Sequence, residues 1–348
     1  MTAISVIVPS NRVGGCDVLF AGLANQTLPR DQFELVFVDN LHTKRESLVK
    51  DYAREYGLQV THVKPFDIGT YENHGGSVAN GCYQRALNTG IVHSRGRVVV
   101  ICCDFTYFAS DFLKLHLSFH DGDHGGGSVC MFGQIWSVDL VPLIHPNWPN
   151  CYGWGAIGHN PALYRDATHV PSYAPWLDDG RRLALIEKWS AQYMKDLRVG
   201  TLDPWMWSVF GKPITPSTDI SEFRVWQKDK TQYSPGLQHH QLANLKDCSF
   251  ATEDLLAIGG LNEAMDGCHG HQDSELAGRL EQQRKTRFWY VPMSRVYLFD
   301  PHYLTIVRSM ERNESANLAI YNEGWTTDFK TPIAQWDLRT KRKELLCL

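Results

Sequence analysis

Residues 97–104 read Arg-Val-Val-Val-Ile-Cys-Cys-Asp, and they follow the segment Ala86-Leu87-Asn88-Thr89-Gly90. The pattern predicts a helix end, a short turn and then a strand buried on both faces, because the apolar run leaves no polar side. The strand ends at the carboxylate of Asp104. Open α/β sheets bind ligands beyond the carboxyl ends of their strands. Asp104 is therefore a candidate ligand for a metal ion and, through it, a diphosphate.

Strand and helix patterns alternate through the first part of the chain. Apolar runs predict strands at residues 4–8, 33–38, 58–63 and 129–136, and helical patterns lie at 45–56, 78–87 and 110–120. Helices between strands at this spacing are typical of right-handed βαβ units and a parallel sheet. The predicted fold class is α/β, with a Rossmann-like, mostly parallel sheet flanked by helices.

The composition changes at residues 136–245, which are rich in Trp and Pro and contain one expected helix at 180–197. A long irregular insertion is usually a lid or a specificity element, although its Trp residues could simply pack. The α/β pattern returns at 246–305, with helices expected at 254–258 and 274–283 and short strands at 288–292 and 295–299. A basic stretch at 339–343 predicts a frayed helix.

Charge and cysteine content restrict the class of protein. The net charge is −4 and the pI is about 6.4, which argues against broad non-specific binding of nucleic acid. The nine cysteines form no Cys-x-x-Cys pair, as expected in a reducing compartment. Neither a signal peptide nor an apolar run of membrane-spanning length is recognisable. We expect a soluble cytoplasmic protein, in the host cytoplasm if the source is viral.

Three carboxylates stand where chemistry is expected. Asp39, followed by Asn40, ends the second strand and could accept a base N–H or ribose hydroxyls, or it could cap a turn. Asp104 could hold Mg²⁺ or Mn²⁺, cap a helix or form a buried salt bridge. Asp273 begins a helix, where it could be a general base or a plain cap.

The order of these motifs resembles that of the family 2 glycosyltransferases, which have the GT-A fold. The matching residues are Pro9 to Asn11, Asp39 with Asn40, the Ala-x-Asn-x-Gly pattern of Ala86, Asn88 and Gly90, Asp104 of an Asp-x-Asp motif, Gly259 to Glu263, and Gln272 to Leu276 with Arg279 and Leu280. The resemblance covers residues 1 to about 135 and 246 to about 305.

This resemblance implies a metal-dependent, inverting transfer of a sugar from a nucleotide-diphosphate sugar, with a UDP-sugar favoured, to an acceptor hydroxyl. Asp273 is then the catalytic base, and Asp104 with His302 holds Mn²⁺ or Mg²⁺. The donor is expected to contact Pro9, Asn11, Arg12, Asp39, Asn40, Arg85, Asn88, Gly90, Cys103 and Asp104.

Two residues depart from the family pattern. Cys102 replaces the first carboxylate of Asp-x-Asp, which usually touches the ribose, and Gln272 replaces the Glu before the base. Both favour the alternative that the chain is a catalytically inactive GT-A protein that binds nucleotides or partners.

The acceptor is open at this stage: a glycan, a lipid-linked sugar, a small molecule or a hydroxymethylated DNA base, as in viral DNA modification. The basic 339–343 stretch favours DNA and the acidic pI disfavours it. We expect residues 1–135 to form the nucleotide-sugar-binding half, 136–245 an acceptor or specificity insertion, 246–305 the catalytic half and 306–348 a C-terminal extension. The sequence does not indicate the oligomeric state.

Overall fold

The structure is a computed structural model, and it describes part of the 348 residues. The described residues are 2–10, 16–66, 83–104, 106–122, 127–137, 245, 247–266, 271–298, 314–326 and 337–347. The Trp-rich insertion, with its expected helix at 180–197, lies outside them apart from its first two residues and residue 245.

The first part of the chain alternates strands and helices as the sequence predicts. Its elements are β1 (Ile4–Ser10), α1 (Cys16–Ala24), the short η1 (Arg30–Gln32), β2 (Phe33–Asp39), α2 (His42–Tyr56), β3 (Val60–Val63), α3 (Tyr83–His93), β4 (Val98–Cys102), β5 (Thr106–Phe108), α4 (Phe112–Asp121) and β6 (Val129–Ser137). Helix α2 ends at Gly57, whose φ of 60° closes the helix in the left-handed conformation that glycine adopts readily.

The later part adds strands to the same sheet and helices to its face. The elements are β7 (Asp247–Ala251), α11 (Thr252–Ala257), the short η4 (Glu263–Met265), α12 (Gln272–Arg284), β8 (Arg287–Leu298), α14 (Glu314–Thr326) and α15 (Leu338–Leu346). The expected helix at 339–343 is thus confirmed and is longer than its basic stretch.

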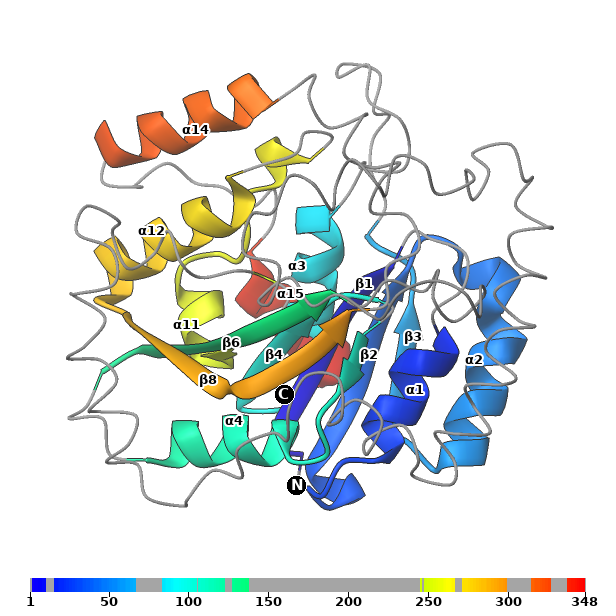
Figure 1. Ribbon diagram of the computed structural model, residues 1–348. Coiled ribbons are helices and arrows are strands. Elements are labelled where there is room, and N and C mark those ends of the chain that lie inside the picture. Colours follow the sequence, from blue (N-terminus) through cyan, green and yellow to red (C-terminus); the bar gives the residue numbers. More distant parts are fainter. Residues whose placement is uncertain are drawn as a thin grey trace, which may run out of the picture.

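One eight-stranded sheet runs through the described part of the molecule in the order β3-β2-β1-β4-β7-β6-β8-β5 (Figure 1). The pairings among β3, β2, β1 and β4 are parallel, as is the pairing of β6 with β8. Strand β7 runs antiparallel to both of its neighbours, β4 and β6. The predicted α/β class with a helix-flanked sheet is confirmed, and the antiparallel β7 joins the early and late parts of the chain.

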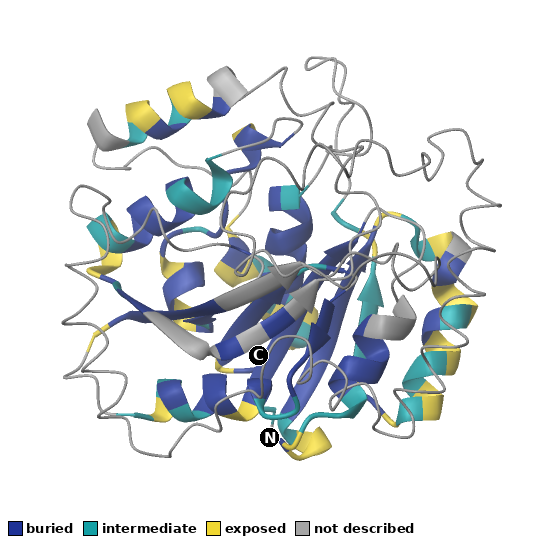
Figure 2. Ribbon diagram, in the orientation of Figure 1, coloured by how far each residue is buried: buried dark blue, intermediate teal, exposed yellow. Residues whose placement is uncertain are grey.

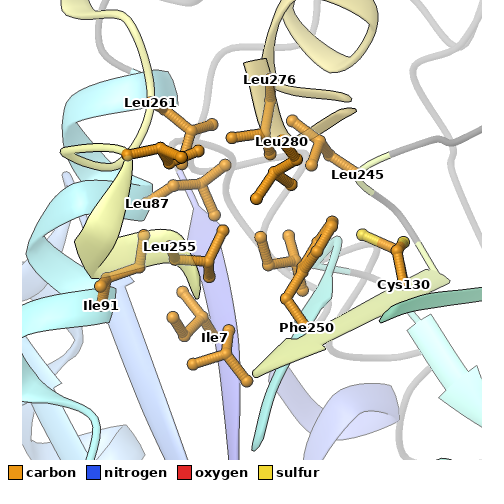
Figure 3. Packing of buried hydrophobic residues seen from close by; sticks show 14 of the residues in the cluster. Ile7, Leu87, Ile91, Cys130, Leu245, Phe250, Leu255, Leu261, Leu276 and Leu280 are labelled. Carbon is orange, nitrogen blue, oxygen red and sulfur yellow. The ribbon is translucent and has the colours of Figure 1, made fainter. Parts of the chain in front are cut away.

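Alternating side chains of the strands fill two cores, one on each face of the sheet. Ile4, Val6 and Val8 of β1 pack against α1, α2 and α4. Ile7 faces the opposite core, together with residues of α3, α11, α12 and α15 (Figure 3). Figure 2 shows the result, a sheet whose central strands are buried between two layers of helices. Because successive side chains of β1 point to opposite faces of the sheet, each residue packs against the helices on its own face.

Helix α3 is longer at its C-terminal end than predicted. The expected helix end at Leu87 is wrong, because α3 continues through Gly90 to His93. A Cβ atom at Gly90 would lie 2.3 Å from Cγ2 of Ile7 in β1. The missing side chain lets the helix approach the strand closely, and this tertiary contact outweighs the weak helix propensity of glycine.

The two strands expected at 288–292 and 295–299 are one strand, β8, with an irregularity in its middle. The register with β6 shifts between Phe132 and Gln134, which lie opposite Tyr290 and Arg295. Gly133 sits at this shift, and a Cβ there would lie 2.4 Å from the carbonyl oxygen of Ser294. The bulge in β8 therefore requires a residue without a side chain on the neighbouring strand.

Among the residues that the structure describes, none of the helices has both the length and the apolar character needed to cross a membrane.

Candidate functional site

The carboxyl ends of β1, β2 and β4 bring the first predicted site residues to one edge of the sheet. Pro9 and Ser10 end β1, Asp39 ends β2, and Asp104 follows β4. Pro9 is buried in the strand at a position beyond the last β1–β4 pair, Ile7 with Ile101, so its missing N–H breaks no bond of that ladder. Because β1 pairs in parallel with both β2 and β4, Asp39 and Asp104 lie at the same edge of the sheet.

Asp39 is fully buried and makes three polar contacts. Its Oδ1 accepts a hydrogen bond from the backbone N–H of Leu41 at 2.7 Å, which is the turn-capping geometry that the sequence left open. Arg45 of α2 contacts the same oxygen at 2.5 Å, and Nε2 of His62 lies 3.0 Å from Oδ2. Burial pushes the pKa of Asp39 up, but the bonds with His62 and Arg45 outweigh it, so this carboxyl group has a lowered pKa.

Arg45 also connects Asp39 to the neighbouring strands. Its Nη2 donates to the Ser10 hydroxyl at 3.0 Å, and that hydroxyl donates to Oδ2 of Asp104 at 2.9 Å. All four side chains are at least nine-tenths buried. A continuous chain of polar contacts therefore joins the two predicted donor-binding carboxylates through Ser10, which lies within the Pro9 to Asn11 match, and Arg45, which the sequence analysis did not single out.

The two cysteines before Asp104 have different surroundings. Cys102 is fully buried in the core beneath α1, α2 and α4. Burial raises the pKa of its thiol well above the usual value, so this position supplies no charge to the site. Cys103 is half-buried between the end of β4 and Asp104. The described strand thus delivers one carboxylate, Asp104, which is 5% exposed.

Asn88, another predicted donor contact, ties α3 to residues 261–263. Its Nδ2 donates to the Leu261 carbonyl at 3.0 Å and to Oε1 of Glu263 at 2.9 Å, and its Oδ1 accepts from the Leu261 N–H at 2.7 Å. Arg85 pairs with Oε2 of the same Glu263 at 3.1 Å. These buried contacts join the two halves of the chain, and the donor contacts of Arg85, Asn88 and Gly90 stay predictions.

Asp266 caps α3 from the other half of the chain. Its two carboxylate oxygens accept from the backbone N–H groups of Gln84 and Arg85, at 2.8 and 3.3 Å. These N–H groups lie in the first turn of α3, where a helix has no carbonyl partners for them. Burial raises the pKa of Asp266 to about 7, although both hydrogen bonds and the charge of Arg85 oppose the rise.

Asp273, the predicted base, is the second residue of α12 and is half-buried. The helix is capped by His271, at φ 63°, so Asp273 does not occupy the N-cap position of the plain-cap alternative. Its Oδ1 accepts from the N–H of Ser274 at 3.0 Å. An acid in the first helical turn is favoured by the helix dipole.

Tyr83 at the start of α3 contacts residue 245, which lies just before β7. Its hydroxyl donates to the Leu245 carbonyl at 3.1 Å. Burial raises the pKa of Tyr83 well above its usual value.

The remaining predicted residues are partly outside the described structure. Asn40 is exposed, and its N–H donates to the Ser10 carbonyl at 2.9 Å. Asn11, Arg12 and His302 lie outside the described residues, so the expected metal ligand His302 stays a prediction.

Metal binding at Asp104 fits the chemistry of the side chain. Within the described ranges, no group of three or more His, Cys, Asp or Glu could hold a metal ion. Mg²⁺ and related ions are commonly held by one or two carboxylates together with substrate phosphates and water. A carboxylate at the carboxyl edge of a parallel sheet, as Asp104 is, meets that requirement.

The sequence analysis missed Arg45, His62, Tyr83 and Asp266, and it included Ser10 in the Pro9 to Asn11 match without giving it a role. The signal for Ser10 was its place between Pro9 and the turn, where a hydroxyl ends a buried strand. Arg45 lies in an ordinary amphipathic helix, and Asp266 is 181 residues away from Arg85. Only the folded chain brings these two beside their partners.

No protein-family profile matches the chain, and no curated protein matches its sequence. Among solved structures, S. aureus TarS is similar, with 14% identity over 94% of this chain and a TM-score of 0.46. This chain spans 44% of that TarS chain. A shorter TarS, solved with UDP-GlcNAc, has 15% identity over 92% of this chain and 71% of its own, with a TM-score of 0.45.

A mannosyltransferase, PcManGT from Pyrobaculum calidifontis in complex with GDP-Man and Mn²⁺, is also similar. It has 16% identity over 98% of this chain and 69% of its own, with a TM-score of 0.47.

Proposed function

We propose that the chain is a metal-dependent glycosyltransferase that moves a sugar from a nucleotide-diphosphate sugar, preferentially a UDP-sugar, to an acceptor hydroxyl. The observation that carries the proposal is the buried chain of contacts at the carboxyl edge of the parallel strands, which joins Asp39 to Asp104 through Arg45 and Ser10. Asp104 follows β4, and Asp273 is the second residue of α12. Asp104 would serve the leaving group, and Asp273 would supply the base that a sugar transfer to a hydroxyl requires.

The donor would lie across the carboxyl edge of β2, β1 and β4. Pro9, Asn11, Arg12, Asp39 and Asn40 would surround the nucleoside. Asp104, with His302, would hold Mn²⁺ or Mg²⁺, which supplies Lewis-acid stabilisation of the departing diphosphate when it is bound.

The transfer itself is a single displacement. Asp273 takes the proton of the acceptor hydroxyl while its oxygen forms a bond to the anomeric carbon. The bond from that carbon to the diphosphate oxygen breaks, and its electron pair leaves with the diphosphate. Attack from the side opposite the leaving group inverts the anomeric centre.

Replacing Asp273 with Asn tests this assignment. We expect Asp273→Asn to lose sugar transfer while it still binds the donor, because the side chain keeps its size and loses its basicity. Release of UDP from a panel of UDP-sugars measures the first property, and a thermal shift with donor and Mn²⁺ measures the second. A variant that transfers at the wild-type rate would refute the base assignment, and full activity in EDTA would refute the metal.

A second candidate function is nucleotide binding without catalysis, and the buried, uncharged Cys102 is the observation that favours it. Wild-type protein that binds UDP and Mn²⁺ but releases no UDP from any UDP-sugar, with or without acceptors, would support this alternative.

The acceptor is proposed to be a glycan or a small molecule rather than DNA. Two basic residues of α15 contact other parts of the chain: Arg339 pairs with Glu253, and Arg342 donates to the Ser94 carbonyl at 3.0 Å. Retention on hydroxymethylated duplex DNA that weakens steeply with salt would instead favour the DNA acceptor.

A further inference from the structure

We infer that Ser10 and Arg45 are positioning residues for Asp104: they fix the carboxylate in the orientation in which it meets a metal ion and a diphosphate. The inference rests on the proposed function, because it assumes that Asp104 is the metal ligand. It goes beyond that function by assigning roles to Arg45, which lies outside the motifs that indicate it, and to Ser10, which lies within the Pro9 to Asn11 motif but has no role assigned there.

The direction of each hydrogen bond in the chain is determined by chemistry. Arg45 has only donors, so the contact of its Nη2 with the Ser10 oxygen at 3.0 Å makes Ser10 the acceptor. The single hydroxyl proton of Ser10 is then directed at Oδ2 of Asp104, 2.9 Å away. Ser10 therefore transmits the positive charge of Arg45 to Asp104 as an oriented dipole.

Arg45 is itself held in one position. Its Nη2 contacts Oδ1 of Asp39, and its guanidinium group lies over the ring of Phe37, 5.5 Å from the centroid. Asp39 is in turn fixed by the Leu41 N–H and by His62. With the Arg45 side chain 7% exposed, water competes little for these contacts.

This support matters because β4 offers one carboxylate where the family pattern has two. Cys102 points into the core and cannot share the orientation of a metal ion with Asp104. Side chains that hydrogen-bond a ligating carboxylate orient it, and their loss typically weakens metal binding by about 10- to 100-fold. Ser10 occupies that place for Asp104, at a position that the first strand fixes.

The chain contains a matched control for Ser10. Ser5 lies on the same strand and is also buried. Its hydroxyl donates to Oε1 of Glu34 at 2.7 Å and accepts from the Gly96 N–H at 2.8 Å. Ser5→Ala therefore removes the same kind of contact from β1, at the end of the strand far from Asp104.

The experiment compares Mn²⁺ binding in the presence of UDP, by calorimetry, for the full-length wild type and four variants. We expect Ser10→Ala to weaken Mn²⁺ binding by about tenfold. Ser10→Thr, which keeps the hydroxyl, and Ser5→Ala should bind as the wild type does, while Asp104→Asn should lose the Mn²⁺-dependent binding. Melting temperatures of all variants show that each is folded.

Each outcome decides between the inference and the proposed function. If Asp104→Asn loses Mn²⁺ binding and Ser10→Ala does not, the positioning role is wrong and the proposed function stands. If Ser5→Ala weakens binding as much as Ser10→Ala, the effect is one of general stability and the inference fails. If Asp104→Asn binds as the wild type does, both the metal role and the inference fail.

Discussion

Asp266 is the residue whose titration the structure predicts most directly. Its pKa in the folded chain is about 7, against an ordinary value of 3.8, because burial removes the carboxylate from water. Between about pH 4 and pH 7 the folded chain holds a proton that the unfolded chain has lost. The free energy of unfolding therefore falls as the pH rises through this range, by at most about 1.4 kcal/mol per pH unit, and levels off above it.

Asp266→Asn removes this titration. We expect the difference in unfolding free energy between the wild type and this variant to decrease from pH 4.5 to pH 7 and then become constant. Urea unfolding at a series of pH values measures it. A difference that stays constant, or grows with pH, would contradict the assignment.

Asp337→Asn is the control, because it also replaces a helix-capping Asp. The hydrogen bond from Thr340 lowers the pKa of Asp337, so the group is ionised in both states above pH 5. The difference in unfolding free energy between Asp337→Asn and the wild type should not change between pH 5 and pH 8.

At this scale the sequence identified the acidic residues at the ends of strands and missed their partners. Asp39, Asp104 and Asp273 could be found because they follow or begin elements with clear patterns. Arg45 could not, because one Arg on an amphipathic helix has no local property that distinguishes it from Arg54, which is exposed and pairs with Asp51. The difference arises only when α2 packs on the sheet.

At the scale of elements, the side chain of Asn88 attaches α3 to residues 261–263, the segment that precedes α12. The side-chain amide of Asn88 makes hydrogen bonds with Leu261 and Glu263 through both its nitrogen and its oxygen. A Cβ atom at residue 260 would lie 2.3 Å from Oδ1 of Asn88, so only glycine fits at this position. The segment 260–263 therefore fits this helix through one side chain.

Asn88→Asp is expected to destabilise the chain more than Asn88→Ala. The Asp variant keeps the shape but removes both donors, and it places a carboxylate beside that of Glu263 in a buried site. We expect a loss of about 3 to 5 kcal/mol in unfolding free energy for Asn88→Asp, against about 1 to 3 for Asn88→Ala. Chemical unfolding at pH 8 tests this order, and the reverse order would contradict the contact with Glu263.

Element boundaries show where local sequence information ends. The strands β1, β2, β4 and β6 lie within one or two residues of the predicted runs, because a strand buried on both faces is apolar throughout. The end of α3 was wrong because the contact of Gly90 with Ile7 is not encoded in the helix itself. The irregularity in β8 likewise depends on Gly133 of another strand.

At the scale of the molecule, the sheet order makes the two predicted halves depend on each other. Within the described sheet, β6 pairs with β7 and β8, and β5 pairs with β8. Residues 1–135, which the sequence analysis predicts to be the nucleotide-sugar-binding half, thus hold β5 and most of β6, whose neighbours all come from residues 247–298. The alternation of strands and helices predicted the parallel strands, but it held no information on where β7 would insert.

A fragment of residues 1–137 is therefore expected to lack a cooperative unfolding transition. The core that contains Ile7 also loses residues of the later elements, including Phe250, Leu255 and Leu276, and the opposite core loses Val296. Thermal unfolding followed by circular dichroism measures this, with the full-length chain as the control. A sharp transition for the fragment alone would show that residues 1–137 are an autonomous domain.

The insertion of β7 between β4 and β6 also has a consequence during synthesis on the ribosome. Strand β6 ends at Ser137 and β7 begins at Asp247, roughly 110 residues later. At about 5 to 20 residues per second, the ribosome needs roughly 5 to 20 seconds to synthesise the segment between β6 and β7. For that time β4 and β6 expose backbone groups that could pair with other nascent chains. The yield of folded protein in cells should therefore depend on translation speed and on chaperones that bind nascent chains.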